Sequence, residues 1–337
     1  YYNPETINPE VIPNPEDGTV DIIYHVEETS ADQIELSGGW GYGRIIGTLG
    51  LSFNNFSLRN FFKKGAWKPV PTGDGQKLSL RVQSYGKGYI SYSASFTEPW
   101  LGGKKPNAFS VSFYHSRYTN GLARYDEAFG YFKINGLSFG LSKRLKWPDD
   151  YFTIYHGINL QRYDLQNWSE IITAGGGTGF YNNFNYNIVV GRNSTSPSPI
   201  YPRNGSEVSV SLEVTPPYSL FSDKDYENLP PEEKYQWIEY YKVKVRFSFF
   251  LELADKLVVN ARMKFGFLGA YNDVIGVTPF ERFYLGGDGL TGYNQLDGRE
   301  IIGMRGYDRP RLITPDKAIY DGIGGTVYDK FTLELRY

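Results

Sequence analysis

The sequence predicts an all-β protein, a transmembrane antiparallel β-barrel, and three observations carry that prediction. Aromatic residues make up 17% of the 337-residue chain, whereas hydrophobic residues as a whole reach only 40%. Apolar and polar residues alternate with a period of two over most of the chain. No apolar run of about 18 residues occurs, which excludes a transmembrane helix but not a barrel, whose strands alternate between aromatic girdles.

Composition excludes several other classes of protein. The chain has no cysteine, so it has no disulfide and no cysteine-ligated metal site. Its three histidines, His25, His115 and His156, are too far apart to suggest a metal site. With 35 Lys and Arg against 37 Asp and Glu, the net charge is −2 and no nucleic-acid partner is expected. We also expect no cofactor and no enzymatic activity, because no catalytic constellation is evident.

Residues 1–30 differ from the rest of the chain. Turn signals are present at Asn3-Pro4, Asn8-Pro9 and Asn14-Pro15. One short strand is expected at 19–27, and a single strand cannot bury a core. We therefore interpret this region as the tail of an upstream domain and place the barrel in residues 31–337.

From Ile34 onward, alternation defines about twelve strands. They are expected near 34–41, 45–56, 76–85, 88–98, 107–118, 131–143, 151–163, 181–192, 206–216, 239–253, 256–270 and 325–337. Most of them are longer than the usual strands of soluble sheets, about 5–6 residues, and match the 9–11 residues that cross a bilayer obliquely.

The parity of these strands distinguishes a membrane barrel from a soluble one. One face of each strand is apolar, as in Val243, Val245 and Phe247, and the other is polar, as in Lys242 and Lys244. Twelve strands enclose a lumen too wide for side chains to fill, so the polar face lines the lumen and the apolar face meets lipid. A soluble carbohydrate-binding or carbohydrate-hydrolysing β protein is the alternative that this parity disfavours.

Connections between the strands are expected to alternate in length, as in outer-membrane barrels. Tight turns are expected at 85–88 and 253–256. The long connections are 119–130, 164–180, 217–238, where a short helix is expected at 230–235, and 271–324.

The connection 271–324 carries two motifs, Phe283-Tyr284-Leu285-Gly286-Gly287 and Met304-Arg305-Gly306-Tyr307. They resemble the FYAGG-like segment and the (V/I)RGF signature of the BamA family, in the POTRA-plus-barrel superfamily of outer-membrane assembly and secretion proteins. Tyr201-Pro202-Arg203-Asn204-Gly205-Ser206 is similar to the family's YPTDGS-like turn. On this resemblance, residues 1–30 are the C-terminal remnant of the last POTRA domain.

The resemblance implies that this loop folds into the lumen. The loop-anchor motif is Met304, Arg305, Gly306 and Tyr307, and its arginine, Arg305, is the residue expected to hold the loop there. Phe283, Tyr284, Gly286 and Gly287 are expected to support the loop. A guanidinium suits an anchor because it stays charged and donates a planar fork of hydrogen bonds. Glu334 shares the luminal parity of Lys330 and Arg336 and is the candidate partner of Arg305.

The resemblance also implies a 16-stranded barrel with a lateral gate between its first and last strands. By that count four strands would follow this chain, whereas a twelve-stranded barrel ending on aromatic Tyr337 is the competing interpretation. The gate strand is Ile34, Glu35, Leu36, Ser37, Gly38, Gly39 and Trp40. Its glycines weaken pairing, so an incoming strand can add to the edge by β-augmentation. Alternatively, the glycines only shape a barrel corner.

The function that the resemblance implies is that of a core insertase, which folds and inserts β-barrel proteins into the bacterial outer membrane without nucleotide hydrolysis. Its expected partners are nascent outer-membrane β-barrel proteins, outer-membrane lipids and the accessory lipoproteins of an assembly complex. A two-partner secretion channel or another transport barrel is the alternative, because it carries the same loop motif.

Overall fold

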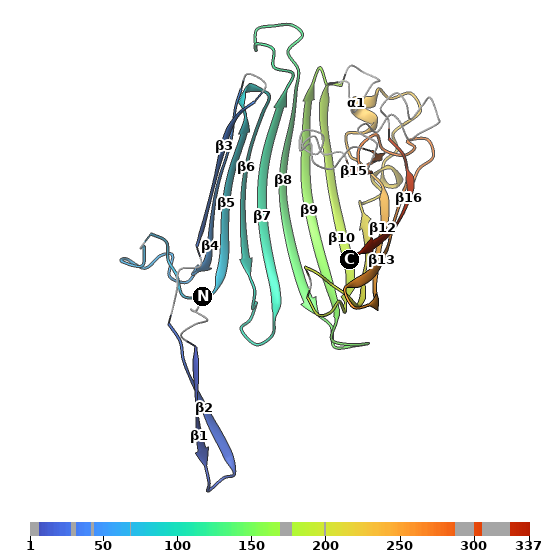
Figure 1. The fold of residues 1–337 in the computed structure, drawn as a ribbon. Helices are drawn as coiled ribbons and strands as arrows, with labels where there is room; N and C mark the ends of the chain where they lie inside the picture. The colour runs from blue at the N-terminus through green and yellow to red at the C-terminus, as the bar shows by residue number, and fades with distance from the viewer. Residues whose placement is uncertain are drawn as a thin grey trace.

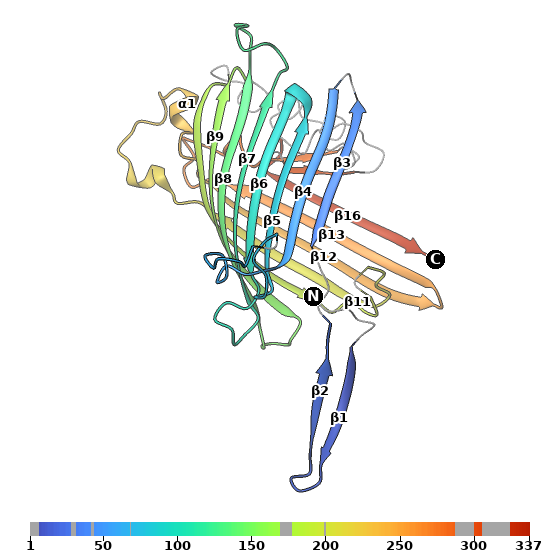
Figure 2. The same ribbon diagram turned by 90° about the vertical axis from the view of Figure 1, so that its left-hand side faces the viewer.

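A single curved antiparallel sheet of twelve strands forms most of the molecule (Figures 1 and 2). The computed structural model describes residues 7–27, 32–41, 44–67, 69–168, 177–198, 200–286, 300–304 and 324–337. In spatial order the strands are β3 (Gln33–Gly41), β4 (Arg44–Phe56), β5 (Gln76–Tyr85), β6 (Tyr89–Glu98), β7 (Asn107–Thr119), β8 (Tyr131–Arg144), β9 (Phe152–Gln166), β10 (Gly179–Asn193), β11 (Gly205–Val214), β12 (Tyr241–Ala254), β13 (Leu257–Gly269) and β16 (Val327–Arg336). The predicted all-β antiparallel fold with twelve strands is confirmed.

Within the described residues the sheet is open. Among the described strands, β3 pairs only with β4, from Gln33 opposite Ser52 to Gly41 opposite Arg44. The one described strand that pairs with β16 in this sheet is β13. Figure 1 places these two edges at opposite sides of the curved wall. Each edge therefore presents a row of backbone N–H and C=O groups that no described strand pairs.

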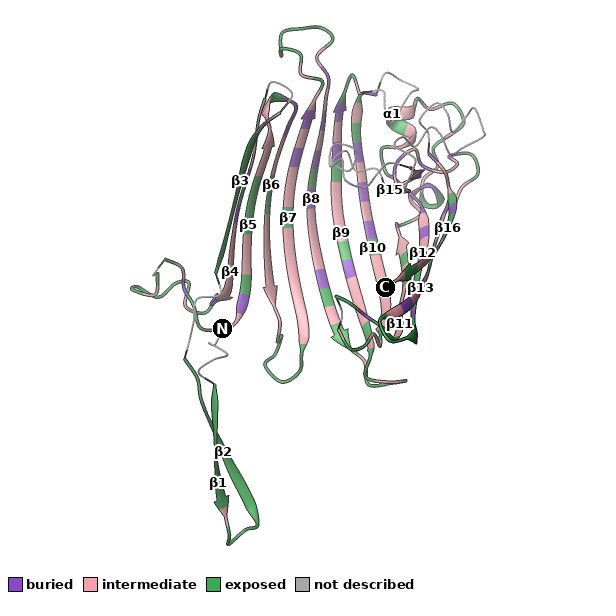
Figure 3. Ribbon diagram, viewed as in Figure 1, coloured by how far each residue is buried: buried purple, intermediate pink, exposed green. Residues whose placement is uncertain are grey.

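The two faces of the sheet are inverted relative to a soluble barrel, as predicted. On β16, Phe331, Leu333 and Leu335 are 73%, 79% and 66% exposed, while Thr332 and Glu334 between them are half-buried. The inner face holds buried polar side chains, among them Asn183, Asn185, Lys242 and Asn260. Figure 3 shows that many of the buried residues, drawn in purple, lie toward the upper end of the strands. An apolar outer face of this extent calls for an apolar environment.

The two longest connections between strands lie at one end of the sheet. Because neighbouring strands are antiparallel, the four predicted long connections all fall at one end, the upper end in Figure 1. The predicted alternation in length does not hold throughout. The tight turn η1 (Gly86–Gly88) shares the upper end, and the long connection 57–75 lies at the lower end. Within this connection, Phe61 and Trp67 meet edge to face, with their ring centroids 5.0 Å apart.

A two-stranded ribbon, β1 (Asn8–Asn14) and β2 (Thr19–His25), extends beyond the lower end of the sheet (Figure 1). The strand predicted at 19–27 is thus confirmed. The turn predicted at Asn8-Pro9 is wrong, because Asn8 begins β1. Pro9 and Pro13 are compatible with this strand because they are four residues apart and so occupy the same set of alternate positions. In a two-stranded ribbon, one set of alternate residues needs no N–H for pairing. All of β2 is exposed, and its assignment to a POTRA domain stays a prediction.

The connection between β13 and β16, residues 270–326, is called the long connection below. It contains β14 (Phe283–Leu285) and β15 (Glu300–Ile302), which pair in parallel. The connection before β12 contains η2 (Tyr218–Phe221) and α1 (Pro231–Lys234), so the helix predicted at 230–235 is confirmed. None of the helices in the described part of the chain is long and apolar enough to cross a membrane.

Candidate functional site

Lys242 is the centre of a polar cluster on the inner face of the sheet. It is the second residue of β12, and side chains alternate between faces along a strand, so Lys242 points inward between outward-facing Tyr241 and Val243. Only 1% of its side chain is exposed. A buried ammonium is costly unless it is paired and hydrogen-bonded, so its partners define the site.

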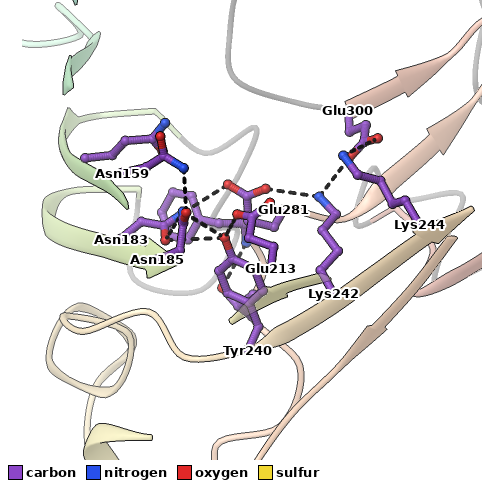
Figure 4. A network of polar contacts seen from close by, with 12 residues as sticks. Asn159, Asn183, Asn185, Glu213, Tyr240, Lys242, Lys244, Glu281 and Glu300 are labelled. Atoms are coloured by element: carbon purple, nitrogen blue, oxygen red, sulfur yellow. Dashed lines mark hydrogen bonds and ion pairs between the residues drawn. The ribbon is translucent and has the colours of Figure 1, made fainter. Parts of the chain in front are cut away.

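Two carboxylates of the long connection hold this ammonium (Figure 4). Glu281 Oε2 lies 3.1 Å from Lys242 Nζ, and Glu300 Oε2 lies 2.7 Å from it. Lys244 Nζ lies 3.2 Å from Glu300 Oε1. We call these four residues, Lys242, Lys244, Glu281 and Glu300, the clamp. The clamp joins two separate segments of the long connection to a single strand of the wall.

The second carboxylate oxygen of Glu281 is also bound by the wall. Glu281 Oε1 accepts hydrogen bonds from Asn183 Nδ2 of β10 at 3.0 Å and from Tyr163 Oη of β9 at 3.4 Å. The backbone of Glu281 has a φ of 64°. That left-handed conformation costs a non-glycine residue roughly 1–2 kcal/mol. The three contacts of the carboxylate offset this cost.

Aromatic rings on both sides of Glu281 seat the long connection on the wall. Phe280 stacks on Tyr163, with ring centroids 5.0 Å apart and planes inclined by 6°. Phe283 meets Tyr328 of β16 edge to face at 4.7 Å. Each such pair adds about 0.5–1.5 kcal/mol beyond the burial of its area. Packing and charge therefore hold the same short segment.

Arg282 joins the two ends of the long connection. Its Nε and Nη2 donate to the carbonyl oxygens of Thr278 and Val277 at 2.8 and 2.9 Å. Its Nη1 donates to the carbonyl oxygen of Gly324 at 3.5 Å. A guanidinium provides these bonds because its five donors lie in a fixed fork.

A hydrogen-bond network behind the clamp links three strands of the wall to Tyr240, the residue directly before β12 (Figure 4). Tyr240 Oη donates to Glu213 of β11 and accepts from Asn185 Nδ2 of β10 at 3.3 Å. Asn185 Oδ1 accepts from Asn159 Nδ2 of β9 at 2.8 Å. A cavity of about 560 Å³ remains beside the network, and Glu213 and Glu281 are among its lining residues. The inner face therefore offers a polar cavity next to a docked loop.

The predicted loop-support residues that the structure describes lie at this site. Phe283 and Tyr284 are 2% and 7% exposed. Gly286 has a φ of 116°, which favours glycine, and its N–H donates to the carbonyl oxygen of Ile302 at 3.0 Å. Gly287 lies outside the described residues.

The predicted anchor motif is described only at its first residue. Met304 is half-buried, whereas Arg305, Gly306 and Tyr307 lie outside the described residues. Lys330 Nζ of β16 donates to the carbonyl oxygen of Gly303, directly before the motif.

Glu334, the candidate partner of Arg305, has two other cations beside it. Its carboxylate lies 2.8 Å from Arg262 Nη2 of β13 and 3.0 Å from Arg336 Nε. It faces the inner side of β16, as its parity predicts. The anchor role of Arg305 stays a prediction.

The predicted gate strand is β3, at the edge of the sheet. Ile34 and Leu36 are 76% and 81% exposed. Glu35 lies between them and reaches Arg81 Nη2 of β5 at 3.1 Å. The pairing of β3 with β4 includes Ser37, Gly38, Gly39 and Trp40, and the side chain of Trp40 lies outside the described part of the structure.

The charged residues of the clamp were not predicted from the sequence. A signal was present, because Lys242 and Lys244 occupy consecutive inward positions near one end of a strand and need acidic partners there. Glu281 lies two residues before Phe283, the first residue of the predicted loop-support motif. What the sequence does not contain is which acid meets which lysine.

Docking of the long connection is expected to weaken in acid. Burial favours the neutral form of the Glu300 carboxyl, but Lys242 and Lys244 outweigh burial and hold its pKa below the usual 4.5. Because the folded-state pKa is the lower one, the contribution of this carboxylate is complete above about pH 4.5 and is lost as the pH falls through the folded-state value.

This pH dependence is measurable by hydrogen exchange of residues 277–286, corrected for the intrinsic exchange rate. We expect constant protection from about pH 8 to about pH 6 and falling protection below about pH 4.5. Glu300→Gln, which cannot titrate, is the control and should show a smaller fall. An acid response of the same size in Glu300→Gln would assign the effect to another group.

Comparison with known proteins places the chain in a family. No curated protein sequence matches it. Its structure is similar to BamA from Haemophilus ducreyi lacking POTRA domains 1–3, with a TM-score of 0.60 and 20% identity over 98% of this chain and 58% of that one. It is also similar to CdiB from Escherichia coli, with a TM-score of 0.50 and 13% identity over 91% of this chain and 50% of that one.

At these identities the similarity shows the fold, and the chain spans only 58% and 50% of the lengths of the two structures. The sequence of residues 72–337 matches the Omp85 superfamily domain. That match covers most of the wall, the clamp and the long connection. The chain therefore belongs to the Omp85 superfamily, and its fold is that of a BamA-like barrel.

Proposed function

We propose that this chain is the barrel of a core insertase, which folds and inserts β-barrel proteins into the bacterial outer membrane through a lateral gate. The observation that carries the proposal is the edge of β3, which no described strand pairs and whose outer residues Ile34 and Leu36 are apolar and exposed. In a bilayer each unpaired backbone group costs several kcal/mol. Such an edge favours pairing with an incoming strand.

The clamp supports this proposal because it holds Glu281 and Glu300 of the long connection on strands other than β3. The contacts of Glu281 are with β9, β10 and β12, while Phe283 packs on β16. Strand pairing and lipid burial of the client supply the free energy, so no nucleotide is needed. The partners are nascent outer-membrane β-barrel proteins, outer-membrane lipids and accessory lipoproteins. Residues 1–30 are the end of a POTRA domain and residues 31–337 the barrel.

A disulfide-trapping experiment tests the gate. The chain has no native cysteine, so Ser37→Cys places one thiol on β3. We expect it to form a disulfide with a cysteine in the last strand of a client barrel during assembly in cells. The matched control is Ser93→Cys in β6, where Ser93 pairs with Arg81 on one side and Tyr114 on the other. Trapping at neither position while clients assemble normally would contradict the proposal.

A second candidate function is a secretion channel of the two-partner type. The fold similarity to CdiB and the polar cavity beside the clamp favour it. A channel passes its client along the inner face, where Ser93 lines that cavity. Trapping at Ser93→Cys in preference to Ser37→Cys would therefore support the channel and oppose the insertase.

Arg305→Ala is expected to impair the assembly of other outer-membrane proteins without unfolding this barrel. The reason is the predicted anchor role, in which the guanidinium holds the loop through a fork of hydrogen bonds. The measurement is the fraction of a client porin that runs as folded protein on unheated gels. Arg305→Lys keeps the charge but loses the fork, so we expect an intermediate result. Full client assembly in Arg305→Ala would contradict the predicted anchor role of Arg305.

A further inference from the structure

A basic pocket lies at the lower end of the sheet, opposite the end that holds the clamp. It is formed by the connection after β6 and the connection after β8, both at the lower end in Figure 1. Its volume is about 810 Å³. Five cations line it, together with Trp147 and Asp150: Lys104, Lys105, Lys143, Arg144 and Lys146. We call it the rim pocket.

The positive charge of the rim pocket is not neutralised within the protein. In the described part of the chain none of the five cations makes an ion pair. The neighbouring acid Asp149 is already bound, with its Oδ2 2.9 Å from Arg192 Nε. Arg144 Nε donates to a backbone carbonyl oxygen, that of Asp150, at 2.6 Å. The cavity is therefore lined by five positive charges and one acidic side chain, and this excess of positive charge favours an anionic ligand.

The pocket lies at the boundary of the apolar outer face. Lys143 follows Leu141 by two residues on β8, so both point to the same outer side of the strand. Trp147 and Trp100 are 82% and 52% exposed at this end. Aromatic rings and lysines whose stems lie along apolar surface are typical of the level of lipid headgroups.

We propose that the rim pocket binds the phosphate-bearing headgroup of an anionic phospholipid from the leaflet that meets this end of the barrel. The proposal rests on the proposed location of the chain in the outer membrane. The lysines and Arg144 contact the phosphate, and the acyl chains continue along the outer face past Leu141. A zwitterionic headgroup fits less well, because its ammonium group is repelled by the same cations.

Lipid retention measured by native mass spectrometry tests the proposal. The full-length protein in detergent is titrated with phosphatidylglycerol and, separately, with phosphatidylcholine of the same chain length. We expect tighter retention of phosphatidylglycerol. The variant Lys104→Gln/Lys105→Gln/Lys146→Gln should weaken it by about a hundredfold, since each cation near a membrane surface contributes about fivefold to the binding of an anionic lipid.

The matched control is Lys63→Gln/Lys64→Gln, which removes two exposed cations from the connection 57–75 at the same end but outside the pocket. We expect it to retain phosphatidylglycerol like the unmodified protein. Equal retention of the two lipids, or equal loss in both variants, would overturn the proposal. The proposal would also be overturned if millimolar inorganic phosphate displaced phosphatidylglycerol and the acyl chains of this lipid had no effect on its affinity.

A failure of the rim pocket is distinguishable from a failure of the proposed function. Insertion of the protein into phosphatidylcholine vesicles, scored by resistance to carbonate extraction, reports on membrane location without the anionic headgroup. Normal insertion with no lipid preference would refute only the proposal for the rim pocket. Failure to insert would refute the proposed membrane location itself.

Discussion

Replacement of Lys242 by methionine is expected to release the long connection from the inner face of the sheet. Glu281 and Glu300 then lose the ammonium that lies between them. Removing one partner of a buried ion pair costs about 3–5 kcal/mol, because the remaining charge stays buried without compensation. Solvent screens little of this effect, since the side chains of Lys242 and Glu281 are 1% and 17% exposed.

Hydrogen exchange of residues 277–286 measures the release. The amides of Phe283 and Gly286 donate to the carbonyl oxygens of Gly325 and Ile302, and both bonds depend on the docked loop. We expect Lys242→Met to speed their exchange by at least about a hundredfold, because each 1.4 kcal/mol changes an equilibrium by about tenfold. Client assembly should fall in parallel if the docked loop serves insertion.

Lys244→Met is the matched control for this prediction. It removes a cation from the same strand and face, but Lys244 contacts only Glu300 within the clamp and is 21% exposed. Its effect on exchange should therefore be about tenfold or less. Lys242→Met combined with Glu281→Gln should recover part of the protection, because Glu300 keeps Lys244 as its partner and no uncompensated carboxylate remains. Exchange in Lys242→Met equal to that of the unmodified protein would show that the clamp does not hold the loop.

The sequence predicts the wall well because its signal is local. Alternation such as Phe331, Leu333 and Leu335 against Thr332 and Glu334 reports directly which face meets the apolar side, and the structure reproduces it. β1 was missed for a local reason as well, since Asn-Pro dipeptides are typical of turns.

The site was only partly predictable because its contacts are not local. Lys242 and Glu281 are 39 residues apart in the chain and meet only when the long connection folds back onto the wall. No periodicity encodes that pairing. The Phe283 motif marked the right segment through its resemblance to a family. The left-handed Glu281 and the fork of Arg282 became visible only with the backbone in place.

Gly266→Ala is expected to unseat the long connection by steric means, with no change in charge. Gly266 of β13 lies opposite Tyr328 of β16. A Cβ at this position would lie 2.2 Å from Tyr328 Cε1 and 2.8 Å from Phe283 Cζ. Both rings are buried and packed edge to face, so neither turns aside freely. Overpacking of this kind costs about 1–3 kcal/mol, and part of that cost falls on the docked Phe283.

Two alanine controls separate loop docking from general strain of the wall. Gly191→Ala in β10 should be tolerated, because the nearest atom to its Cβ would be Thr153 Oγ1 at 3.4 Å. Gly140→Ala in β8 should strain the sheet, with its Cβ 2.7 Å from the ring of Tyr155, but it lies away from Phe283. We expect Gly266→Ala alone to speed exchange of residues 277–286. If Gly140→Ala does so equally, loop docking follows the stability of the whole sheet, and the seat at Gly266 has no separate role.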